Sequence, residues 1–387
     1  MNHLKKPPTP EGLRIRMVTP GFPPARGGVE EHCRHLATRF AQNGDQVSVL
    51  TASRTEPVGR SHRTDGVEVR TYRAWQTGIM SISGRLTLAG LTDPAGASDI
   101  LHVHSYHAST GFAALAGLRR PVVFTPHYHG TGHSPLARKL HRGYRLLGRA
   151  MFSAADAIIC VSEAEKRAVI VDFPAVADRI RVIPNGVDRA AIRAAEPFDD
   201  QPPTVLVVGR LEPYKGVAPV IEAMSHLPEP TQLIVIGTGS QSEELARRAR
   251  DAELGSRVRI LGAVGTLELH RWMRTAQVLV SLSDHEAFGM VPLEAATAGS
   301  RVVLSEIPAH REISDRYLGP AAQLIAPDRS PAAVADALRR SLLESERVRV
   351  DVPDWSDVAQ ATRSVYRDML GHHRSPIPTR DQLWSTT

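Results

Sequence analysis

Short apolar, β-prone runs alternate with helical segments along almost the whole chain, and this alternation limits the possible folds more than any other feature. Strands that alternate with helices pair into a parallel sheet whose two faces are covered by the helices. The sequence therefore predicts an α/β protein. The runs are 47–50, 67–72, 100–104, 122–125, 157–161 and 180–183 in the first half, and 204–208, 233–236, 258–261, 278–282, 302–304 and 322–325 in the second.

The chain has 387 residues, which is too long for one ordinary core and suits two domains of roughly 150 to 200 residues. Residues 190–203 are rich in Ala, Pro and acidic residues and show no core pattern, so we expect them to be the interdomain linker. The first dozen residues are expected to be a flexible tail.

Composition excludes several classes of protein. Cys33 and Cys160 are far apart, so neither a disulfide framework nor a cysteine metal cluster is expected, and a reducing, cytoplasmic setting fits. No run of 18 apolar residues exists, so a membrane span is not expected. The basic start at 1–12 has no apolar segment behind it, so a signal peptide is not expected either. The net charge of +6 favours anionic partners, but charge alone does not choose between sugar nucleotides, acidic lipids and nucleic acid.

The stretch 283–299 reads as a strand end, a loop and the start of a helix. Phe288 and Gly289 break the strand, Pro292 suits the first helical position, and Gly299 closes the helix. A helix that begins near Val291 points free backbone N–H groups at the loop, which makes an anion site.

Two acids, Glu286 and Glu294, frame this helix start. Eight helical residues span about 12 Å, whereas the paired carboxylates of glycosidases lie about 5–10 Å apart, so the two acids are expected to bind two ends of a ligand. The alternative is a solvated helix start with a capping acid.

Two glycine-containing loops follow strands. Residues 20–28 connect a strand to a helix but lack a G-x-G-x-x-G fingerprint, so a dinucleotide site is weakly supported and a tight turn is the alternative. In 209–216, Arg210 and Lys215 can neutralise a diphosphate, although a surface pair is the alternative. Lys215 is one of only five lysines among 47 basic residues.

Histidines gather after two successive strands, with His102, His104 and His107 at the first and His127 and His129 after the second. His102 and His104 would share a strand face, as zinc ligands can. Because no cysteine or carboxylate lies close in sequence, we expect no metal and place these side chains at the ligand-binding edge of the sheet.

Five separated phrases, taken in order, resemble the retaining family 4 glycosyltransferases. The resemblance implies two Rossmann-like domains of the GT-B type, facing each other across a cleft. It further implies an acceptor-binding domain at 13–190 plus about 366–387, with the last helix crossing back, and a donor-binding domain at 204–365. The phrases are Gly27-Gly28, His127, the I-P-N-G-V-D of 183–188, Arg210 with Lys215, and the E-x7-E pair Glu286 and Glu294.

The resemblance also implies roles for individual residues. The co-substrate would be a nucleoside-diphosphate sugar, with no cofactor and no metal, in keeping with the lack of an Asp-x-Asp pair. Ala287, Thr297 and Ser300-Arg301 depart from the family pattern but leave both acids in place. The implied catalytic residues are His127, Arg210, Lys215 and Glu286; the donor-binding residues are Gly28, Gly209, Gly237, Phe288, Gly289, Met290, Val291 and Glu294; and the acceptor-binding residues are Gly27, Glu30, His104 and His129.

We therefore expect a retaining hexosyltransferase that acts on a hydroxyl of a small natural-product acceptor, as in antibiotic biosynthesis, with no nucleic-acid partner. A membrane glycolipid or cell-envelope acceptor is the alternative, because the basic amphipathic segment 134–152 could touch an anionic membrane or could simply pack on the sheet. Outside this class, an epimerase, a phosphorylase or a non-catalytic sugar- or surface-binding protein remains open. The donor base and the oligomeric state are not determined by the sequence.

Overall fold

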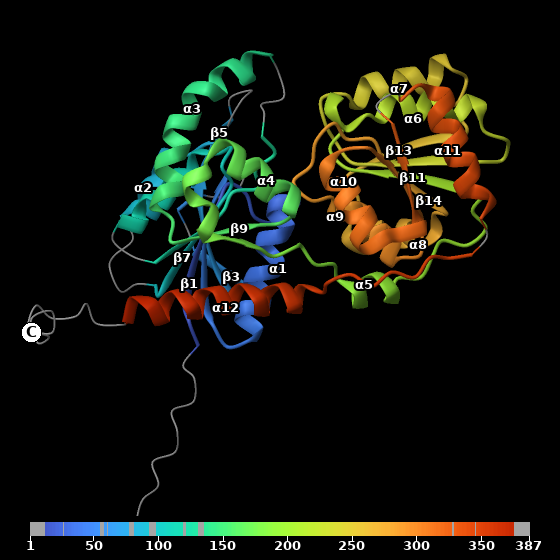
Figure 1. The fold of residues 1–387 in the computed structure, drawn as a ribbon. Helices are drawn as coiled ribbons and strands as arrows, with labels where there is room; N and C mark the ends of the chain where they lie inside the picture. Colours follow the sequence, from blue (N-terminus) through green and yellow to red (C-terminus); the bar gives the residue numbers. More distant parts are fainter. Residues whose placement is uncertain are drawn as a thin grey trace, which may run out of the picture. The chain divides into compact units, whose positions relative to one another are not determined.

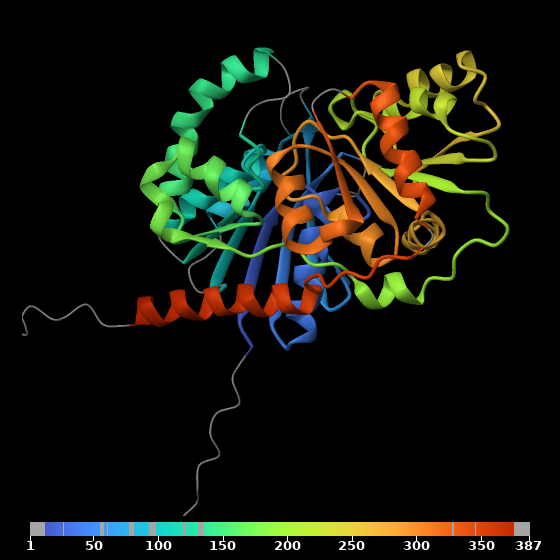
Figure 2. The same ribbon diagram turned by 45° about the vertical axis from the view of Figure 1, so that its right-hand side comes forward.

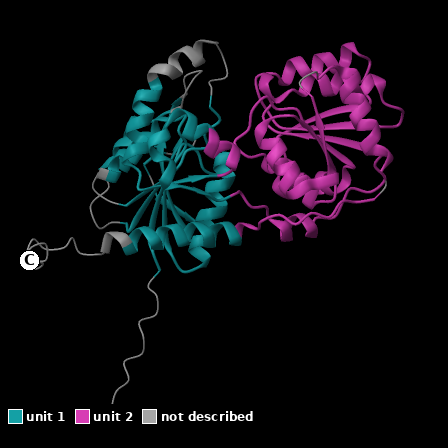
Figure 3. Ribbon diagram, viewed as in Figure 1, with its two compact units in different colours: residues 1–160, 168–183, 356–387 teal, residues 161–167, 184–355 magenta. Residues whose placement is uncertain are grey.

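The computed structural model describes most of the chain and divides it into two compact units (Figure 3). Unit 1 comprises 1–160, 168–183 and 356–387, and unit 2 comprises 161–167 and 184–355. The side chains of 76, 81, 118, 135–143 and 372–374 are outside the description. Residues 1–11, which make up most of the expected tail, are outside it altogether. The described residues are 12–25, 27–54, 58–59, 61–76, 81–92, 98–118, 121–130, 135–326, 329–344 and 346–374.

Unit 1 is built on an eight-stranded sheet in the order β10-β9-β8-β7-β1-β2-β4-β3, in which only β3 is antiparallel to its neighbour (Figure 1). Strands β5 and β6, which follow β4 in the chain, form a separate short antiparallel hairpin. The strands are β1 Arg14–Thr19, β2 Gln46–Ser53, β3 Ser61–Thr64, β4 Val67–Arg73, β5 Trp75–Gln76, β6 Ser81–Ile82, β7 Ile100–His104, β8 Val122–Thr125, β9 Ala157–Cys160 and β10 Ile180–Val182. The helices are α1 Gly28–Gln42, α2 Gly84–Leu91, η1 Ser109–Leu118, α3 Pro135–Ala154, α4 Glu163–Asp172, η2 Pro174–Arg179 and α12 Trp355–Arg374.

Helices cover both faces of this sheet. On one face Leu86 of α2, the alanines of η1 and Phe152 of α3 pack on alternate strand residues such as Val103 and Phe124. Phe40 of α1 and Tyr366 of α12 lie together with ring centroids 5.6 Å apart. The Tyr366 hydroxyl also lies 2.6 Å from His102 Nδ1 on β7, which fixes α12 to the sheet.

Unit 2 contains a six-stranded parallel sheet in the order β13-β12-β11-β14-β15-β16. Helices α6, α7 and α11 pack on one face, and α5, α8 and α9 pack on the other (Figure 2). The strands are β11 Thr204–Val208, β12 Gln232–Ile236, β13 Val258–Gly262, β14 Val278–Ser281, β15 Arg301–Ser305 and β16 Ala322–Ile325. The helices are α5 Arg189–Ala194, η3 Pro213–Lys215, α6 Val217–Ala223, η4 Met224–His226, α7 Ser242–Asp251, α8 Thr266–Thr275, α9 Met290–Thr297, α10 Pro308–Ile313, the π-turn η5 Ser314–Leu318, η6 Gly319–Ala321 and α11 Pro331–Leu343.

The predicted α/β class with two Rossmann-like domains is confirmed. Numbered within its own unit, the second sheet has the order 3-2-1-4-5-6 of the doubly wound nucleotide-binding fold. Unit 1 has the same reversal of strand order at β1, whose two neighbours are β2 and β7. Within the described residues, no helix combines the length and the apolar character that crossing a bilayer requires.

Two of the expected boundaries differ from the structure. Residues 190–203 are not a free linker, because Ile192 of α5 is buried and the Phe198 ring lies 4.5 Å from that of Trp272 in unit 2. Their apolar positions are too sparse to show a period, yet Ile192 and Ala195 are buried. The return to unit 1 comes at Ser356 instead of about residue 366, and Arg363 on α12 already contacts Asp45 at 2.8 Å.

Candidate active site

The predicted donor residues of unit 2 lie in two loops at one edge of its sheet. The loop with Arg210 and Lys215 follows β11, and the loop with Glu286 follows β14. These two strands are neighbours at which the strand order reverses. Because ligands of doubly wound folds bind outside the carboxyl ends of strands at such a switch point, the fold brings the two motifs to the position where a ligand binds.

Lys215 and Glu286 form a direct ion pair across this switch point. Lys215 Nζ donates to Glu286 Oε1 at 2.5 Å, and Ser283 Oγ donates to the same oxygen at 2.8 Å. The two ionic side chains are only 20% and 22% exposed. Because both side chains are largely sheltered from solvent, the surface alternative does not fit Lys215.

The electrostatics keep Glu286 ionised. Burial acts to raise its pKa, but the ammonium of Lys215 and the hydrogen bonds from Lys215 and Ser283 outweigh burial, so the pKa of Glu286 lies below its ordinary value. Burial lowers the pKa of the nearby His310 to about 4, against the opposing effect of Glu286. At neutral pH Glu286 is therefore a carboxylate and His310 a neutral imidazole.

Arg210 is positioned by an aromatic side chain. Its Nη2 donates to the hydroxyl of Tyr214 at 2.5 Å, and Lys215 Nζ lies 5.2 Å from the centre of the Tyr214 ring. Tyr214 in turn stacks on His285 with ring centroids 4.5 Å apart. The ring thus touches both cations and fixes their spacing, while the Arg210 side chain stays exposed.

Gly209 and Gly237 allow two loops to approach closely. A Cβ added to Gly237 would lie 1.8 Å from the carbonyl oxygen of Gly209, and the φ of Gly237 is +143°. Leu211 N also donates to Thr238 O at 2.9 Å across the same contact. Any side chain at Gly237 would therefore displace the loop that carries Arg210.

Helix α9 begins with backbone donors that no side chain caps. Its N-cap is Gly289, in a left-handed conformation with φ +100°, and the described residues provide no side-chain cap, so the N–H groups of Met290 and Val291 point into the loop. The helix starts at Met290, so Pro292 is its third residue, not its first, and Glu294 lies in the second turn. The Phe288 side chain is buried in the core at 3% exposure, which leaves only its backbone for a ligand.

Unit 1 places its glycine loop at its own switch point, after β1. Gly27 is the N-cap of α1, and the helix begins at Gly28. A Cβ on Gly27 would lie 2.4 Å from Glu30 Oε2, and one on Gly21 would lie 2.5 Å from Glu30 Oε1. The Glu30 carboxylate therefore packs against the loop backbone, so it can shape this loop whether or not it binds an acceptor.

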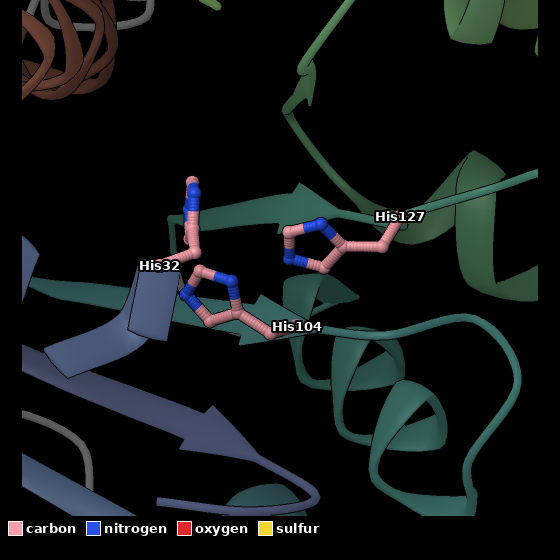
Figure 4. Close-up of side chains that lie close together, drawn as sticks. All are labelled: His32, His104 and His127. Atoms are coloured by element: carbon pink, nitrogen blue, oxygen red, sulfur yellow. The ribbon is translucent and has the colours of Figure 1, made fainter. Parts of the chain in front are cut away.

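Three histidines of unit 1 come together at this edge (Figure 4). His104 ends β7, His127 follows β8, and His32 comes from α1. One nitrogen from each ring lies within 4.8 Å of the other two. His129 is separate from them and stacks on His107 at 4.3 Å. His102 is structural, since its two nitrogens contact Tyr366 and Thr125.

Sequence reasoning missed four residues of these sites. Tyr214 lies inside the loop 209–216 and Ser283 opens the stretch 283–299, so both could have been found from their position beside the charged residues. His32 and His310 gave no signal, because only the fold brings them to their clusters.

Two Rossmann-like units, each with polar loops at its switch point, are typical of nucleotide-binding proteins. Comparison with known families makes this specific. Residues 26–191 match the model of Glycosyltransferase Family 4, and residues 188–352 match that of Glycosyl transferases group 1. The chain therefore belongs to the family 4 glycosyltransferases of the group 1 type, as the resemblance predicted, and it is a glycosyltransferase.

Individual relatives agree with this assignment. A protein named glycogen synthase from Mycobacterium tuberculosis is 31% identical, over 95% of this chain and 97% of its own length. A phosphatidyl-myo-inositol mannosyltransferase from the same species is 29% identical, over 93% and 98%. Among solved structures, Anabaena HepE, solved with UDP and glucose, has a similar fold, with a TM-score of 0.67, 18% identity and coverage of 94% and 100%.

Proposed function

We propose that this chain transfers a hexose from a nucleoside-diphosphate sugar to an acceptor hydroxyl, with retention at the anomeric carbon and without a metal ion. The observation that carries the proposal is the sheltered pair of Lys215 and Glu286, set beside the uncapped start of α9 at a switch point. This arrangement supplies positive charge for a diphosphate and a fixed carboxylate for sugar hydroxyls.

The main task in such a transfer is to stabilise the departing diphosphate. Arg210 offers a planar fork of donors, Lys215 a compact charge, and the N–H groups of Met290 and Val291 a helix dipole. These groups neutralise developing negative charge without a metal. Loops containing Gly209 and Gly237 would hold the rest of the nucleotide, and Glu294 is proposed to accept hydrogen bonds from the ribose.

Retention is proposed to follow from attack on the same face that the diphosphate leaves. The bond from the anomeric carbon to the phosphate oxygen breaks, the bond to the acceptor oxygen forms, and the acceptor proton passes to that phosphate oxygen. Glu286 is ionised and tied to Lys215 and Ser283, so its role is to orient sugar hydroxyls. In unit 1 we propose that His127 contacts the transferred sugar, and that Gly28 lies near the donor phosphate.

For the acceptor, we propose a small soluble compound that presents a hydroxyl, with Gly27, Glu30, His104 and His129 nearest to it. The relatives support a polyhydroxylated acceptor more than an antibiotic aglycone, since their names include a glycogen synthase, a phosphatidyl-myo-inositol mannosyltransferase and a D-inositol 3-phosphate glycosyltransferase. Sugars and cyclitols are therefore the first acceptors to test.

A lipid-linked acceptor at a membrane surface is the second candidate, and one feature of α3 favours it. Leu146 and Leu147 are 65% and 51% exposed beside the exposed Arg149. Arg145, by contrast, pairs with Asp172, so its charge is not available to lipid. The other basic residues expected in this role, Arg138, Lys139 and Arg142, have side chains outside the described part.

The donor class is tested by thermal stability with UDP-, GDP- and dTDP-sugars, because a ligand of the folded state stabilises it in proportion to its affinity. UDP-sugars come first, given that HepE was solved with UDP-glucose. Transfer is then assayed with cyclitol and sugar acceptors after chelation. Stabilisation by one donor class with product of retained configuration supports the proposal; inverted product or an absolute need for divalent metal refutes it.

The acceptor class needs its own test. The two candidates are separated by sedimentation with anionic vesicles. The natural chain is compared with a double variant that carries Leu146→Ser and Leu147→Ser. Binding that the double substitution abolishes favours a lipid-linked acceptor, and absence of binding favours a soluble one.

A further inference from the structure

The histidine triad of unit 1, defined as His32, His104 and His127, has a composition and placement that sugar binding alone does not require. Each residue comes from a different element, and the three rings converge at the carboxyl edge of the sheet (Figure 4). His32 and His104 are buried, and His127 is the most exposed of the three.

The contrast between His104 and His102 shows what is unusual here. The two lie on the same strand, with rings 4.0 Å apart. Both nitrogens of His102 lie within hydrogen-bonding distance of Tyr366 and Thr125 hydroxyls, at 2.6 and 2.8 Å. Among the described residues, neither nitrogen of the buried His104 has a hydrogen-bond partner, and neither does Nε2 of His127. Buried polar atoms almost always have hydrogen-bond partners, so we infer that these nitrogens bind a ligand.

The imidazoles are also in the form that metals bind. Burial, and then the neighbouring histidines, hold the pKa of His104 and of His127 well below the ordinary value. Both rings are therefore neutral near pH 7, with a lone pair to donate. The backbone of His127 has φ +48°, a left-handed conformation that non-glycine residues seldom adopt and that functional sites often hold.

We propose that His32, His104 and His127 bind one divalent transition-metal ion of the Zn²⁺ class. Three imidazoles and an open fourth position are a common zinc arrangement, and nitrogen donors favour Zn²⁺, Co²⁺, Ni²⁺ or Cu²⁺ over Mg²⁺ and Ca²⁺. With metal–nitrogen distances of about 2.0–2.1 Å, tetrahedral geometry needs nitrogens about 3.3 Å apart. The ligand nitrogens now lie up to 4.8 Å apart, so the rings must rotate toward one another to bind an ion.

The consequence of binding rests on the proposed function, in which His127 contacts the transferred sugar. An ion that coordinates His127 removes it from that contact, so the ion inhibits a reaction that does not itself need metal. The site thus acts as an inhibitory site within unit 1.

Binding is tested on the full chain after chelation, by titration with Co²⁺, whose visible absorption is intense in tetrahedral nitrogen sites, followed by displacement with Zn²⁺. We expect one ion per chain. His32→Gln and His104→Gln should each weaken Co²⁺ binding by more than the roughly 10- to 100-fold lost with an outer-shell partner. The matched control is His226→Gln, which changes an exposed histidine of unit 2.

Retained far-ultraviolet circular dichroism shows that each variant folds, and if His104→Gln does not fold, His32→Gln provides the test. If the natural chain gives no tetrahedral Co²⁺ spectrum, or if the folded variants keep that spectrum, the proposed metal site is wrong. If saturating Zn²⁺ leaves the rate of sugar transfer unchanged, the proposed inhibition is wrong. A metal-free chain that transfers no sugar refutes the proposed function separately, because the Co²⁺ spectrum does not depend on transfer.

Discussion

Replacing Lys215 with alanine is the perturbation whose effects the structure specifies most fully. The change removes the ammonium that lies 2.5 Å from Glu286 Oε1 in a pair about one-fifth exposed. It also removes one of the charges proposed to stabilise the leaving diphosphate. Loss of one preorganised donor to a developing anion costs about 2.7–4 kcal/mol, so kcat should fall roughly 10²- to 10³-fold.

The same substitution should change the pH dependence of the residual activity. In the natural chain Lys215 holds the pKa of Glu286 below its ordinary value, so Glu286 is ionised at every pH above the ordinary carboxyl range. Without Lys215 the effect of burial prevails and the pKa of Glu286 rises. The acid limb of the activity profile should therefore move to higher pH.

The assay is donor-dependent product formation between pH 4 and pH 9, with Lys166→Ala as the matched control. Lys166 pairs with Glu163 at 3.5 Å on the surface, so its loss should leave kcat within about twofold. If Lys215→Ala behaves like Lys166→Ala in both rate and pH profile, the proposed role of the pair is wrong.

Three further predictions concern stability. Gly237→Ala, whose Cβ would lie 1.8 Å from Gly209 O, should destabilise unit 2 and weaken nucleotide binding in calorimetry, whereas Gly255→Ala, which meets no atom within 4 Å, should do neither. Tyr366→Phe leaves His102 Nδ1 without its partner and should cost about 1–3 kcal/mol in urea unfolding. Tyr317→Phe removes a hydroxyl that bonds to none of the described residues and should be nearly neutral; equal losses in the two variants would contradict this reasoning. Because the pKa of Glu286 is lowered in the folded protein, its ionisation stabilises the fold above the ordinary carboxyl pKa, and this stability is lost as pH falls through the folded value. The free energy of unfolding of Glu286→Gln should therefore fall less on acidification than that of the natural chain. An unchanged pH dependence of unfolding would count against the pair.

The fold was predictable because local patterns set it. Alternating strands and helices fixed the parallel sheets, and the switch points follow from strand order. The motif residues Arg210, Lys215 and Glu286 converge because their loops leave adjacent parallel strands. Gly299 ends α9 in a left-handed conformation, as its position indicated.

Other features depend on contacts that a linear pattern does not contain. Ile192 and Phe198 are single apolar side chains without a period, so the segment that carries them read as a linker although it packs on unit 2. His32 and His310 reach their clusters from elements distant in sequence. The convergence of three histidines was not predicted, because His32 is far in sequence from His104 and His127.

The central claim is that a diphosphate binds between Lys215, Arg210 and the start of α9 in unit 2. A crystal structure of the chain with a nucleoside diphosphate tests it most directly. The account predicts phosphate oxygens within about 2.7–3.2 Å of Lys215 Nζ and of the backbone N–H groups of Met290 and Val291. A diphosphate bound elsewhere, with these donors facing only solvent or Glu286, would contradict it.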